Sequence, residues 1–289
     1  MGLKIIVLAK QVPDTRNVGK DAMKEDGTVN RGALEAIFNP EDLHALEQAL
    51  FLKDMVENTE ITVLTMGPAR ASNILREAMY RGADKAVLVT DKRFAGSDTL
   101  ATSYALACAI KKIGDYDLVI CGRQAIDGDT AQVGPQVAQK LGIPQVTYAE
   151  EVTIDKKRLV VKRRLERGIE TVACKMPLLI TVHNSAPPCR SRNAKYTMKY
   201  KHARTISELQ EENRDYTELF DKYPYLHITE WNVDDVDADT TYLGLSGSPT
   251  KVKKIENVVF QSKEAKQIED SDNDIDALMK ELIDSHVIG

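Results

Sequence analysis

Four short apolar runs, each followed by a stretch of helical composition, constrain the fold of this 289-residue chain more than any other feature. The runs occupy residues 3–8, 61–66, 85–89 and 117–121. Near-continuous apolar runs of this length are typical of strands buried on both faces, and helices between them supply the crossovers of a parallel sheet. The alternation persists for about 140 residues. It therefore predicts an α/β fold with a doubly wound, mostly parallel sheet.

The loops that follow these strands are the places where such a sheet binds ligands. In an open α/β sheet the ligand lies outside the carboxyl ends of the strands, at the point where the strand order reverses. We therefore expect the loops after Leu8, Met66, Val89 and Cys121 to gather at this edge of the sheet.

The loop after Cys121 reads GRQAIDGDTAQVGPQ, and it leads into a predicted helix over residues 131–141 that stops at Gly142. The first N–H groups of a helix lack partners within the helix, and the helix dipole is positive there, so this start suits a nucleotide phosphate. Gly128 permits a turn that a side chain would block. The candidates for capping the helix are Asp127, Asp129 and Thr130.

The same loop has a plainer interpretation, that of an ordinary strand-to-helix connection with a good cap. Asp127 and Asp129 oppose a phosphate unless they point away from it or Arg123 offsets their charge. The loop also lacks the Gly-Lys-Ser/Thr sequence of a P-loop. Spacing alone therefore leaves both interpretations open.

Two other segments belong to the same predicted edge. Residues 9–14 read AKQVPD and follow the first strand, where Pro13 favours a loop. Asn39 precedes a proline and two acids, which is the pattern of a strong helix start with Asn39 as its cap. Leucines recur at roughly helical spacing in residues 43–55 and indicate a helix packed on the core.

Charge and cysteine content narrow the class of protein. The formal net charge of −5 provides no basic footprint for nucleic acid. No apolar run reaches about 18 residues, so we expect no membrane insertion, and the amino terminus does not resemble a signal peptide. The four cysteines form no C-x-x-C pair, so neither a metal site nor an iron–sulfur site is indicated. We expect a cytoplasmic protein with reduced thiols.

The pattern changes after Pro144. Residues 147–154, 159–165, 169–174 and 178–182 read as β segments separated by turns. Their alternation predicts antiparallel strands appended to the parallel sheet.

Three further segments complete the chain. Residues 184–202 are rich in Arg, Lys, Ser and Pro and predict an exposed loop, whose charges solvation alone would explain. Residues 203–240 carry many acids and predict an insertion or arm rather than core. Residues 274–287 place apolar side chains at helical spacing, which fits packing on a partner subunit or on the chain's own domain. We therefore divide the chain into a domain of residues 1–200 and a carboxyl-terminal extension of residues 203–289.

Four stretches together resemble one known family. They are residues 7–14 (VLAKQVPD), 38–42 (FNPED), 66–69 (MGPA) and 122–134 (GRQAIDGDTAQVG), in the family's order. The chain resembles the electron-transfer flavoprotein beta subunit. The resemblance implies a Rossmann-like, adenine-nucleotide-binding domain that pairs with an alpha subunit. It also implies that residues 184–202, which depart from the family's usual sequence there, dock onto a partner flavin dehydrogenase.

The resemblance further implies which residues line the nucleotide. We expect Gly128 and the amides of residues 129–132 to face phosphate oxygens, and no side chain to act as a catalytic acid or base. The implied cofactor-binding residues are Ala9, Lys10, Gln11, Val12, Asn39, Asp42, Thr65, Met66, Gly67, Asp98, Thr99, Arg123, Gln124, Asp127, Gly128, Asp129, Thr130, Ala131 and Gln132.

The family has two branches, which differ in the nucleotide that this subunit holds. One branch holds AMP as a scaffold. The other holds FAD, which NADH reduces, and the two electrons are divided between a low-potential acceptor such as ferredoxin and a dehydrogenase. Residues 97–99 (SDT), 128–130 (GDT) and 247–250 (GSPT) resemble this second, electron-bifurcating branch more closely. A dinucleotide needs donors for a second phosphate, and Thr99 at a second helix start is the candidate.

The alternative from another functional class is a stand-alone adenine-nucleotide-binding module of the universal-stress or ATP-pyrophosphatase type. Such modules share the layered α/β fold, so the fold alone does not distinguish them from a flavoprotein subunit. The pyrophosphatase type requires a Ser-Gly-Gly loop after the first strand, where this chain has Ala9-Lys10-Gln11. The stress type requires a spaced glycine loop, and the chain shows none. A hydrolase also lacks support, since no Gly-x-Ser-x-Gly sequence occurs.

Overall fold

The computed structural model describes residues 2–14, 34–156, 158–212, 216–251, 265 and 267–288, and the chain divides into two compact units, residues 1–253 and 254–289. The strands of the first unit are β1 (Lys4–Leu8), β2 (Gln11–Pro13), β3 (Ala36–Phe38), β4 (Glu60–Met66), β5 (Lys85–Val89), β6 (Leu118–Gly122), β7 (Gln145–Asp155), β8 (Arg158–Leu165), β9 (Gly168–Cys174), β10 (Leu178–Val182) and β11 (Thr229–Trp231). Its helices are α1 (Pro40–Met55), α2 (Ser72–Arg81), α3 (Thr99–Ile113), α4 (Val133–Leu141), α5 (Ala194–Tyr200), α6 (Ile206–Glu211) and α7 (Tyr216–Lys222). Helix α8 (Asp272–Asp284) belongs to the second unit.

Within the described residues, a nine-stranded sheet runs in the order β11-β5-β4-β1-β6-β10-β7-β8-β9. The pairs from β11 to β7 are parallel, whereas β7, β8 and β9 pair in an antiparallel meander. The predicted α/β fold with a doubly wound, mostly parallel sheet and appended antiparallel strands is thus confirmed. The chain runs from β1 to β4 and β5 on one side and places β6 on the other. The strand order therefore reverses between β1 and β6.

Strand β10 differs from its prediction. The sequence predicts an antiparallel strand at residues 178–182, but β10 pairs in parallel with β6 on one side and with β7 on the other. All five of its residues are buried. A run that is apolar on both faces, as in LLITV, is the pattern of an interior parallel strand, so this run resembles β1 and β6 rather than the alternating β8.

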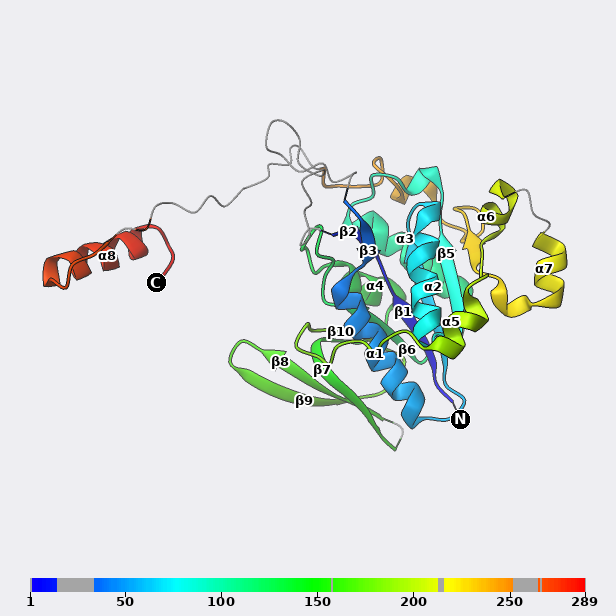
Figure 1. The fold of residues 1–289 in the computed structure, drawn as a ribbon, viewed down its shortest axis with the longest axis horizontal. Coiled ribbons are helices and arrows are strands. Elements are labelled where there is room, and N and C mark those ends of the chain that lie inside the picture. Colours follow the sequence, from blue (N-terminus) through cyan, green and yellow to red (C-terminus); the bar gives the residue numbers. More distant parts are fainter. Residues whose placement is uncertain are drawn as a thin grey trace. The chain divides into compact units, whose positions relative to one another are not determined.

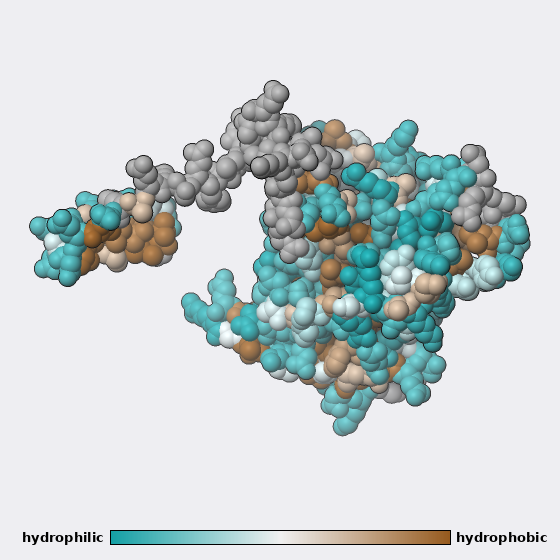
Figure 2. All heavy atoms as spheres, in the orientation of Figure 1, coloured by the Kyte–Doolittle hydropathy of each residue, from teal (hydrophilic) through white to brown (hydrophobic). Residues whose placement is uncertain are grey.

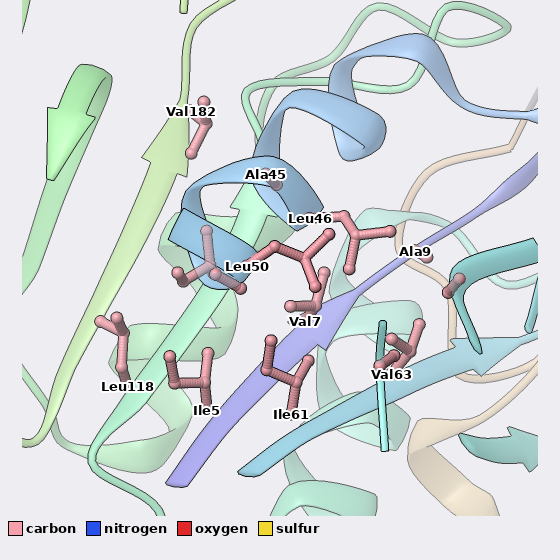
Figure 3. Packing of buried hydrophobic residues seen from close by; sticks show 14 of the residues in the cluster. Ile5, Val7, Ala9, Ala45, Leu46, Leu50, Ile61, Val63, Leu118 and Val182 are labelled. Carbon is pink, nitrogen blue, oxygen red and sulfur yellow. The ribbon is translucent and has the colours of Figure 1, made fainter. Parts of the chain in front are cut away.

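Helices cover both faces of the parallel part of the sheet. α1 and α2 contribute to the core on one face, and α3 and α4 to the core on the other (Figure 1). Figure 3 shows Leu46 and Leu50 of α1 directed at Val7 of β1 and Ile61 of β4, and all four side chains are buried. Burial of each such leucine contributes about 2 kcal/mol to folding. This packing fixes α1 across β1 and β6 and so places its amino end at the switch point.

Residues 203–240 contribute to the core, so the prediction of an arm outside the core is wrong for this segment. Leu209, Leu226 and Ile228 are buried, and β11 extends the sheet beside β5. The acids that suggested an arm, such as Glu211 and Asp235, lie on the exposed side. Their abundance reflects a solvated surface, because charged residues cover the outside of a segment whose apolar residues point inward.

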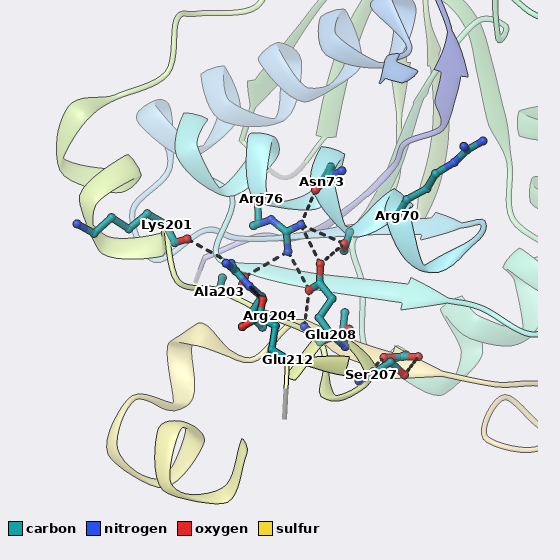
Figure 4. A network of polar contacts seen from close by, with 12 residues as sticks. Arg70, Asn73, Arg76, Lys201, Ala203, Arg204, Ser207, Glu208 and Glu212 are labelled. Atoms are coloured by element: carbon teal, nitrogen blue, oxygen red, sulfur yellow. Dashed lines mark hydrogen bonds and ion pairs between the residues drawn. The ribbon is translucent and has the colours of Figure 1, made fainter. Parts of the chain in front are cut away.

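An ion pair between α2 and α6 fastens this segment to the sheet (Figure 4). Both guanidinium nitrogens of Arg76 donate to the carboxylate of Glu208 at 2.9 Å, and Ser72 Oγ donates to the same carboxylate at 2.8 Å. Glu208 also accepts from the backbone N–H of Thr205, which completes a capping box at the start of α6. The two side chains are only 12% and 19% exposed, so the pair is poorly screened by water.

We expect Glu208→Ala to lower the free energy of unfolding by about 2 kcal/mol, because it leaves the Arg76 guanidinium partly buried without its anion and removes half of the capping box. Urea unfolding and proteolysis after residue 204 measure the effect. Glu208→Gln is the matched control: it retains the shape and one acceptor oxygen, and its loss of stability should be smaller. Equal stability of wild type and Glu208→Ala would contradict this prediction.

Residues 184–202 contain helix α5, so the prediction of an exposed loop is wrong over residues 194–200. The Asn193 side chain caps α5, and Tyr200 is buried against the core. Arg190 forms an ion pair with Glu47 of α1 at 2.8 Å. Part of the charge that suggested a solvated rim therefore holds the segment on the domain.

Helix α8 confirms the predicted helix near the carboxyl terminus. Of its apolar side chains at helical spacing, Ile275, Met279 and Ile283 are exposed, and Leu278 and Leu282 are partly exposed. Among the helices of the described part of the chain, none is long and apolar enough to cross a membrane.

Candidate functional site

The carboxylate of Asp42 joins the ends of the two strands that flank the switch point. Its Oδ2 accepts from the backbone N–H of Lys10, after β1, at 2.9 Å. Its Oδ1 accepts from the backbone N–H of Gly122, at the end of β6, at 3.0 Å. The side chain is buried. Asp42, predicted to line the nucleotide, therefore holds the two loops in position from beneath.

Burial raises the pKa of the Asp42 carboxyl to about 7, because the charged form loses its water. The hydrogen bonds from Asn39, Lys10 and Gly122 favour the charged form and oppose this effect, and nearby Glu41 adds to it. Desolvation is the largest of these contributions. The group below the loops therefore changes charge near neutral pH.

Asn39 occupies the capping position of α1, as predicted, but its side chain makes no capping hydrogen bond. Its Nδ2 donates to the carbonyl of Gln124 at 2.9 Å, and its Oδ1 accepts from the N–H of Ile126 at 3.3 Å. Pro40 at the first helical position has no N–H, and the amide of Asn39 instead fixes the loop after β6. The Asn39 side chain therefore holds the loop after β6 in place rather than capping helix α1.

The charges of the loop are not balanced by Arg123, which is one of the two possibilities that the sequence leaves open. Arg123 does not offset Asp127: its Nη2 pairs with Glu41 at 3.1 Å. Lys10 neutralises Asp127 instead, with Nζ 2.8 Å from both carboxylate oxygens. Gln124 Nε2 donates to Asp129 at 2.8 Å. Both aspartates that oppose a phosphate therefore have donors of their own, Lys10 from the loop after β1 and Gln124 from the loop after β6.

Helix α4 begins at Val133, two residues later than predicted, and Gln132 in the capping position makes no side-chain cap. The candidates Asp127, Asp129 and Thr130 do not cap it. The first N–H groups of α4 therefore lack a side-chain partner, which suits an anionic oxygen. Gly134 permits this placement of the helix, because a Cβ there would lie 2.8 Å from Cys121 Sγ.

The backbone before α4 adopts an uncommon conformation. Asp129 and Ala131 have φ values of 50° and 53°, in the left-handed region that side chains disfavour. Conformations of this kind concentrate at binding sites, where surrounding contacts impose them. Gly128 lies in open space, since nothing stands within 4 Å of the position of a Cβ. Residues 128–130 are exposed and thus accessible to a ligand.

A second polar cluster surrounds the start of α3. The carboxylate of Asp98 caps the helix, accepting from the N–H groups of Leu100 and Ala101 at 3.0 Å. Asp98 also receives the hydroxyl of Thr250 at 2.7 Å, and its own N–H donates to Ser248 Oγ at 2.8 Å. The two segments that resemble the bifurcating branch, SDT and GSPT, thus lie in contact although about 150 residues separate them.

Thr99 connects the two clusters. Its hydroxyl donates to Gln132 Oε1, at the start of α4, at 2.8 Å. Gln136 Nε2, one turn further along α4, donates to the same hydroxyl at 3.5 Å. Polar groups therefore continue from the loop after β1, across the start of α4, to the start of α3.

The remaining predicted residues fall into two groups. Ala9 and Val12 are buried, so they offer only their backbone at the edge. Gln11, Met66 and Gly67 are half-exposed there, and Gln11 Nε2 donates to the carbonyl of Arg70 at 3.2 Å.

Two buried polar atoms near these loops indicate whether the residues present fit a nucleotide. Thr65 Oγ1 and Gln136 Oε1 have no hydrogen-bond partner in the part of the chain that the structure describes. Such atoms are rare unless a ligand or water satisfies them. Together with the uncapped start of α4 and the open space at Gly128, they fit an adenine nucleotide.

Gln136 and Glu41 belong to the site but are not among the residues that the sequence predicts for it. Gln136 lies one helical turn after Gln132, so its position on the same face of α4 is the available signal. The sequence predicts only that Glu41 complements the dipole of α1, but its carboxylate also accepts from the N–H of Gln124 at 3.1 Å.

Comparison with known proteins adds independent findings. Residues 26–206 match the family described as "Electron transfer flavoprotein domain". The chain is 45% identical over 252 residues to the electron transfer flavoprotein subunit beta of Clostridium acetobutylicum, covering 87% of each chain. It is 40% identical over 295 residues to the subunit of the same name from Megasphaera elsdenii, covering 99% of this chain and 100% of the other. It is 42% identical over 251 residues, 86% of each chain, to the caffeyl-CoA reductase-Etf complex subunit CarD of Acetobacterium woodii.

Proposed function

Because this chain belongs to the electron transfer flavoprotein family as a beta subunit, with a role in electron transfer, we propose that it holds FAD. We further propose that it takes part in flavin-based electron bifurcation. In this proposal NADH is the reductant and an alpha subunit is the direct partner. One electron goes to a low-potential acceptor such as ferredoxin, and the other goes to a partner flavin dehydrogenase.

The observation that carries the choice of FAD is the hydrogen bond from Thr99 to Gln132. AMP brings one phosphate, for which the uncapped start of α4 suffices. FAD brings two, and the second requires polar groups continuous with the first. The Thr99–Gln132 bond joins the start of α4 to the start of α3 and provides this continuity.

The residues of the site bind and orient the nucleotide rather than transfer protons. FAD, when bound, supplies both two-electron and one-electron chemistry. The amides at the start of α4 bind the phosphate, and Lys10 keeps the charge of Asp127 from repelling it. Asp42 and Asn39 hold the loops after β1 and β6 at a fixed separation.

The partners in this proposal rest on surfaces of this chain and on the names of relatives. The exposed apolar side chains of α8 suit an alpha subunit. Helix α5 exposes Met198 to 63% between lysines, which suits docking of a dehydrogenase. One relative belongs to a caffeyl-CoA reductase complex, and another, the acryloyl-CoA reductase electron transfer subunit gamma of Anaerotignum propionicum, is 40% identical. A reductase of an acyl-CoA thioester is accordingly the proposed class of dehydrogenase.

One observation favours the alternative, in which this subunit holds AMP as a scaffold. The carboxylate of Asp98 already accepts from the first free amides of α3, and a carboxylate there repels a second phosphate. The hydroxyls of Thr99 and Thr250 already donate their single protons to Gln132 and Asp98, so neither offers a free donor to a second phosphate at this helix start.

Cofactor analysis of the heterodimer distinguishes the two. We expect two FAD per heterodimer, both reduced on titration with NADH, as measured by extraction and visible absorption. Thr99→Val, which removes the hydroxyl between α3 and α4, should lower the FAD content toward one per heterodimer, whereas Thr102→Val in the same helix should not. One FAD with one AMP, and no reduction by NADH, would refute the proposal.

A further inference from the structure

The chain between β10 and α5, residues 184–193, lies against α1 and α2 on one face of the sheet (Figure 1). We call these residues the connecting segment. His44 Nδ1 of α1 is hydrogen-bonded to the carbonyl of Pro187 at 2.9 Å. The N–H of Asn193 donates to the carbonyl of Tyr80, near the end of α2, at 2.8 Å. Both halves of the connecting segment are therefore bonded to helices that cover the core.

Glu47 of α1 makes the most extensive of these contacts. Its carboxylate accepts from the backbone N–H of Arg190 at 2.8 Å, from Nη2 of the same residue at 2.8 Å and from Nε at 3.0 Å. Paired bonds between a guanidinium and a carboxylate fix the orientation of both groups. The Glu47 side chain is only 14% exposed, so water screens the pair weakly. Glu47 therefore fixes both the backbone and the side chain of Arg190.

The other ionic contacts of the connecting segment are more exposed. Arg190 Nη2 also lies 2.8 Å from Asp54 Oδ2, but the Asp54 side chain is exposed. Arg192 pairs with Glu77 of α2, and this arginine is exposed as well. Exposed ion pairs contribute little to stability, because water screens them and ordering the side chains costs entropy. The contact with Glu47 is therefore the one whose loss should release the connecting segment.

Helix α5 relies on contacts outside itself for its position. It has only seven residues, and a helix of this length is not stable alone in water. The Asn193 side chain caps its start, and Tyr200 at its end is buried. Met198, which lies between these two points, is exposed. The position of Met198 therefore depends on where the connecting segment delivers the start of α5.

Helix α1 links the connecting segment with the candidate nucleotide site. Asn39 and Asp42, at the start of α1, hold the loops after β1 and β6. Glu47 follows Asp42 by five residues on the same helix, whose buried leucines fix it on the sheet. One helix therefore holds both the nucleotide loops and the segment that leads to α5. Held in this way, α5 has a fixed position relative to those loops.

Helix α5 lies next to α1 on a surface that is mostly hydrophilic, with hydrophobic patches between (Figure 2). Leu50 of α1 and Tyr196 of α5 both approach the position of a Cβ at Gly82, at 3.0 Å and 3.5 Å. On α1, Phe51 and Met55 are exposed. Exposed apolar side chains of this kind suit contact with another protein. A partner that docks on α5 would therefore meet α1 as well, provided that α5 keeps this position.

We propose that Glu47 is a positioning residue for the partner dehydrogenase. Through Arg190 it holds the connecting segment on α1, and it thereby keeps α5, with Met198, in the place where the dehydrogenase docks. The role requires no contact of Glu47 with the dehydrogenase or with the nucleotide. This inference rests on the docking surface of the proposed function and names the residue that fixes this surface in place.

Hydrogen exchange in the heterodimer tests the positioning without the dehydrogenase. Glu47→Gln keeps the size of the side chain but removes its charge and one acceptor oxygen. The amides of Arg190 and Asn193 should then exchange at least about tenfold faster, because the connecting segment opens more often. The amides of β1 report global unfolding and should be unaffected. Unchanged exchange of the connecting segment in Glu47→Gln would overturn the proposal.

Glu60→Gln is the matched control. It removes the same charge from an exposed pair with Lys85, at the start of β4, and should leave these exchange rates within about twofold of wild type. An equal acceleration in the two variants would show a general effect of charge and would overturn the assignment to Glu47.

Steady-state kinetics tests whether the position of α5 matters for docking. The probe is the caffeyl-CoA reductase of Acetobacterium woodii with caffeyl-CoA, because the subunit CarD of that complex is 42% identical to this chain. Glu47→Gln should raise the KM for the heterodimer about tenfold, while kcat and the rate of reduction by NADH change less than about twofold. A fall in all of these rates with an unchanged KM would indicate a general loss of structure and overturn the proposal.

A double variant tests whether Glu47 acts through Arg190. In the Arg190→Ala background, Glu47→Gln should change the KM by less than about twofold, because the contact that it removes is already lost. Additive effects of the two substitutions would overturn the assignment.

Met198→Glu separates this inference from the proposed function. It places a charge on the docking surface and should also raise the KM for the heterodimer. An unchanged KM in Met198→Glu, or no electron transfer from wild type to the reductase, would overturn the proposed docking and this inference with it. A raised KM in Met198→Glu with an unchanged KM in Glu47→Gln would overturn only the role of Glu47.

Discussion

Gly122→Val is expected to lower the free energy of unfolding of the beta subunit by about 3 kcal/mol, because the end of β6 has no room for a side chain. A Cβ at this position would lie 2.6 Å from Asp42 Oδ1 and 2.6 Å from the carbonyl carbon of Glu41. One of these is a backbone atom of α1, whose position is fixed by the buried leucines of that helix. The strand and the helix would have to separate, and the hydrogen bond from Gly122 to Asp42 would break.

Gly128→Val, in the loop after β6, introduces the same side chain but should affect nucleotide binding rather than stability. No atom lies within 4 Å of a Cβ at Gly128, so we expect the free energy of unfolding to change by less than about 0.5 kcal/mol. Nucleotide retention should fall, since the valine occupies space beside the donors of α4. Urea unfolding of the isolated subunit and nucleotide content after gel filtration measure the two effects. Equal losses of stability, or full nucleotide content in Gly128→Val, would contradict the placement of these loops.

Asp42→Asn is the second substitution with a large expected effect. An amide has one acceptor oxygen, so of the N–H groups of Lys10 and Gly122 one would face the NH2 group instead of an oxygen. Leaving one buried N–H unpaired costs about 1–3 kcal/mol. The loops after β1 and β6 would also lose their common anchor, so nucleotide affinity should fall together with stability.

The pH dependence of this difference follows from the raised pKa of Asp42. The folded chain holds its proton up to a pKa of about 7, against 3.8 for the free side chain. Folding is therefore favoured by protonation, and this contribution is fully present below about pH 4 and is lost as pH rises through 7. The stability advantage of wild type over Asp42→Asn should therefore decrease as the pH rises from about 4 through 7. An advantage that grows with pH would show that the carboxyl is ionised in the folded state.

The sequence predicts most of the parallel sheet because each interior strand carries its signal locally. The runs that became β1, β4, β5 and β6 are apolar at nearly every position, a pattern that burial on both faces requires. β10 carries the same local signal, but its place between β6 and β7 depends on pairing across the sheet, which no local pattern encodes.

In the candidate site, too, features set by neighbouring residues can be predicted from the sequence, whereas contacts between distant residues cannot. The helix start at Asn39 is recognisable from its neighbours, but the use of its side chain is not, because its partners at Gln124 and Ile126 lie more than 80 residues away. The contact of Asp98 with Thr250 spans 152 residues. The resemblance to a family identifies such segments as candidates for one site, but the tertiary structure determines which of them are in contact.

The position of β10 also has a consequence for the order in which the chain can fold during synthesis. β6 and β7 are consecutive parallel strands in the chain, yet the space between them belongs to a strand that is made more than 20 residues after β7 ends. A nascent chain that ends before Leu178 has two unpaired strand edges facing an empty position in the sheet. Closing that position is a non-local step, because β10 must enter between strands already in place. The ribosome-bound chain therefore gains a complete sheet core only after Val182 has emerged, and truncations upstream of this residue should aggregate rather than fold.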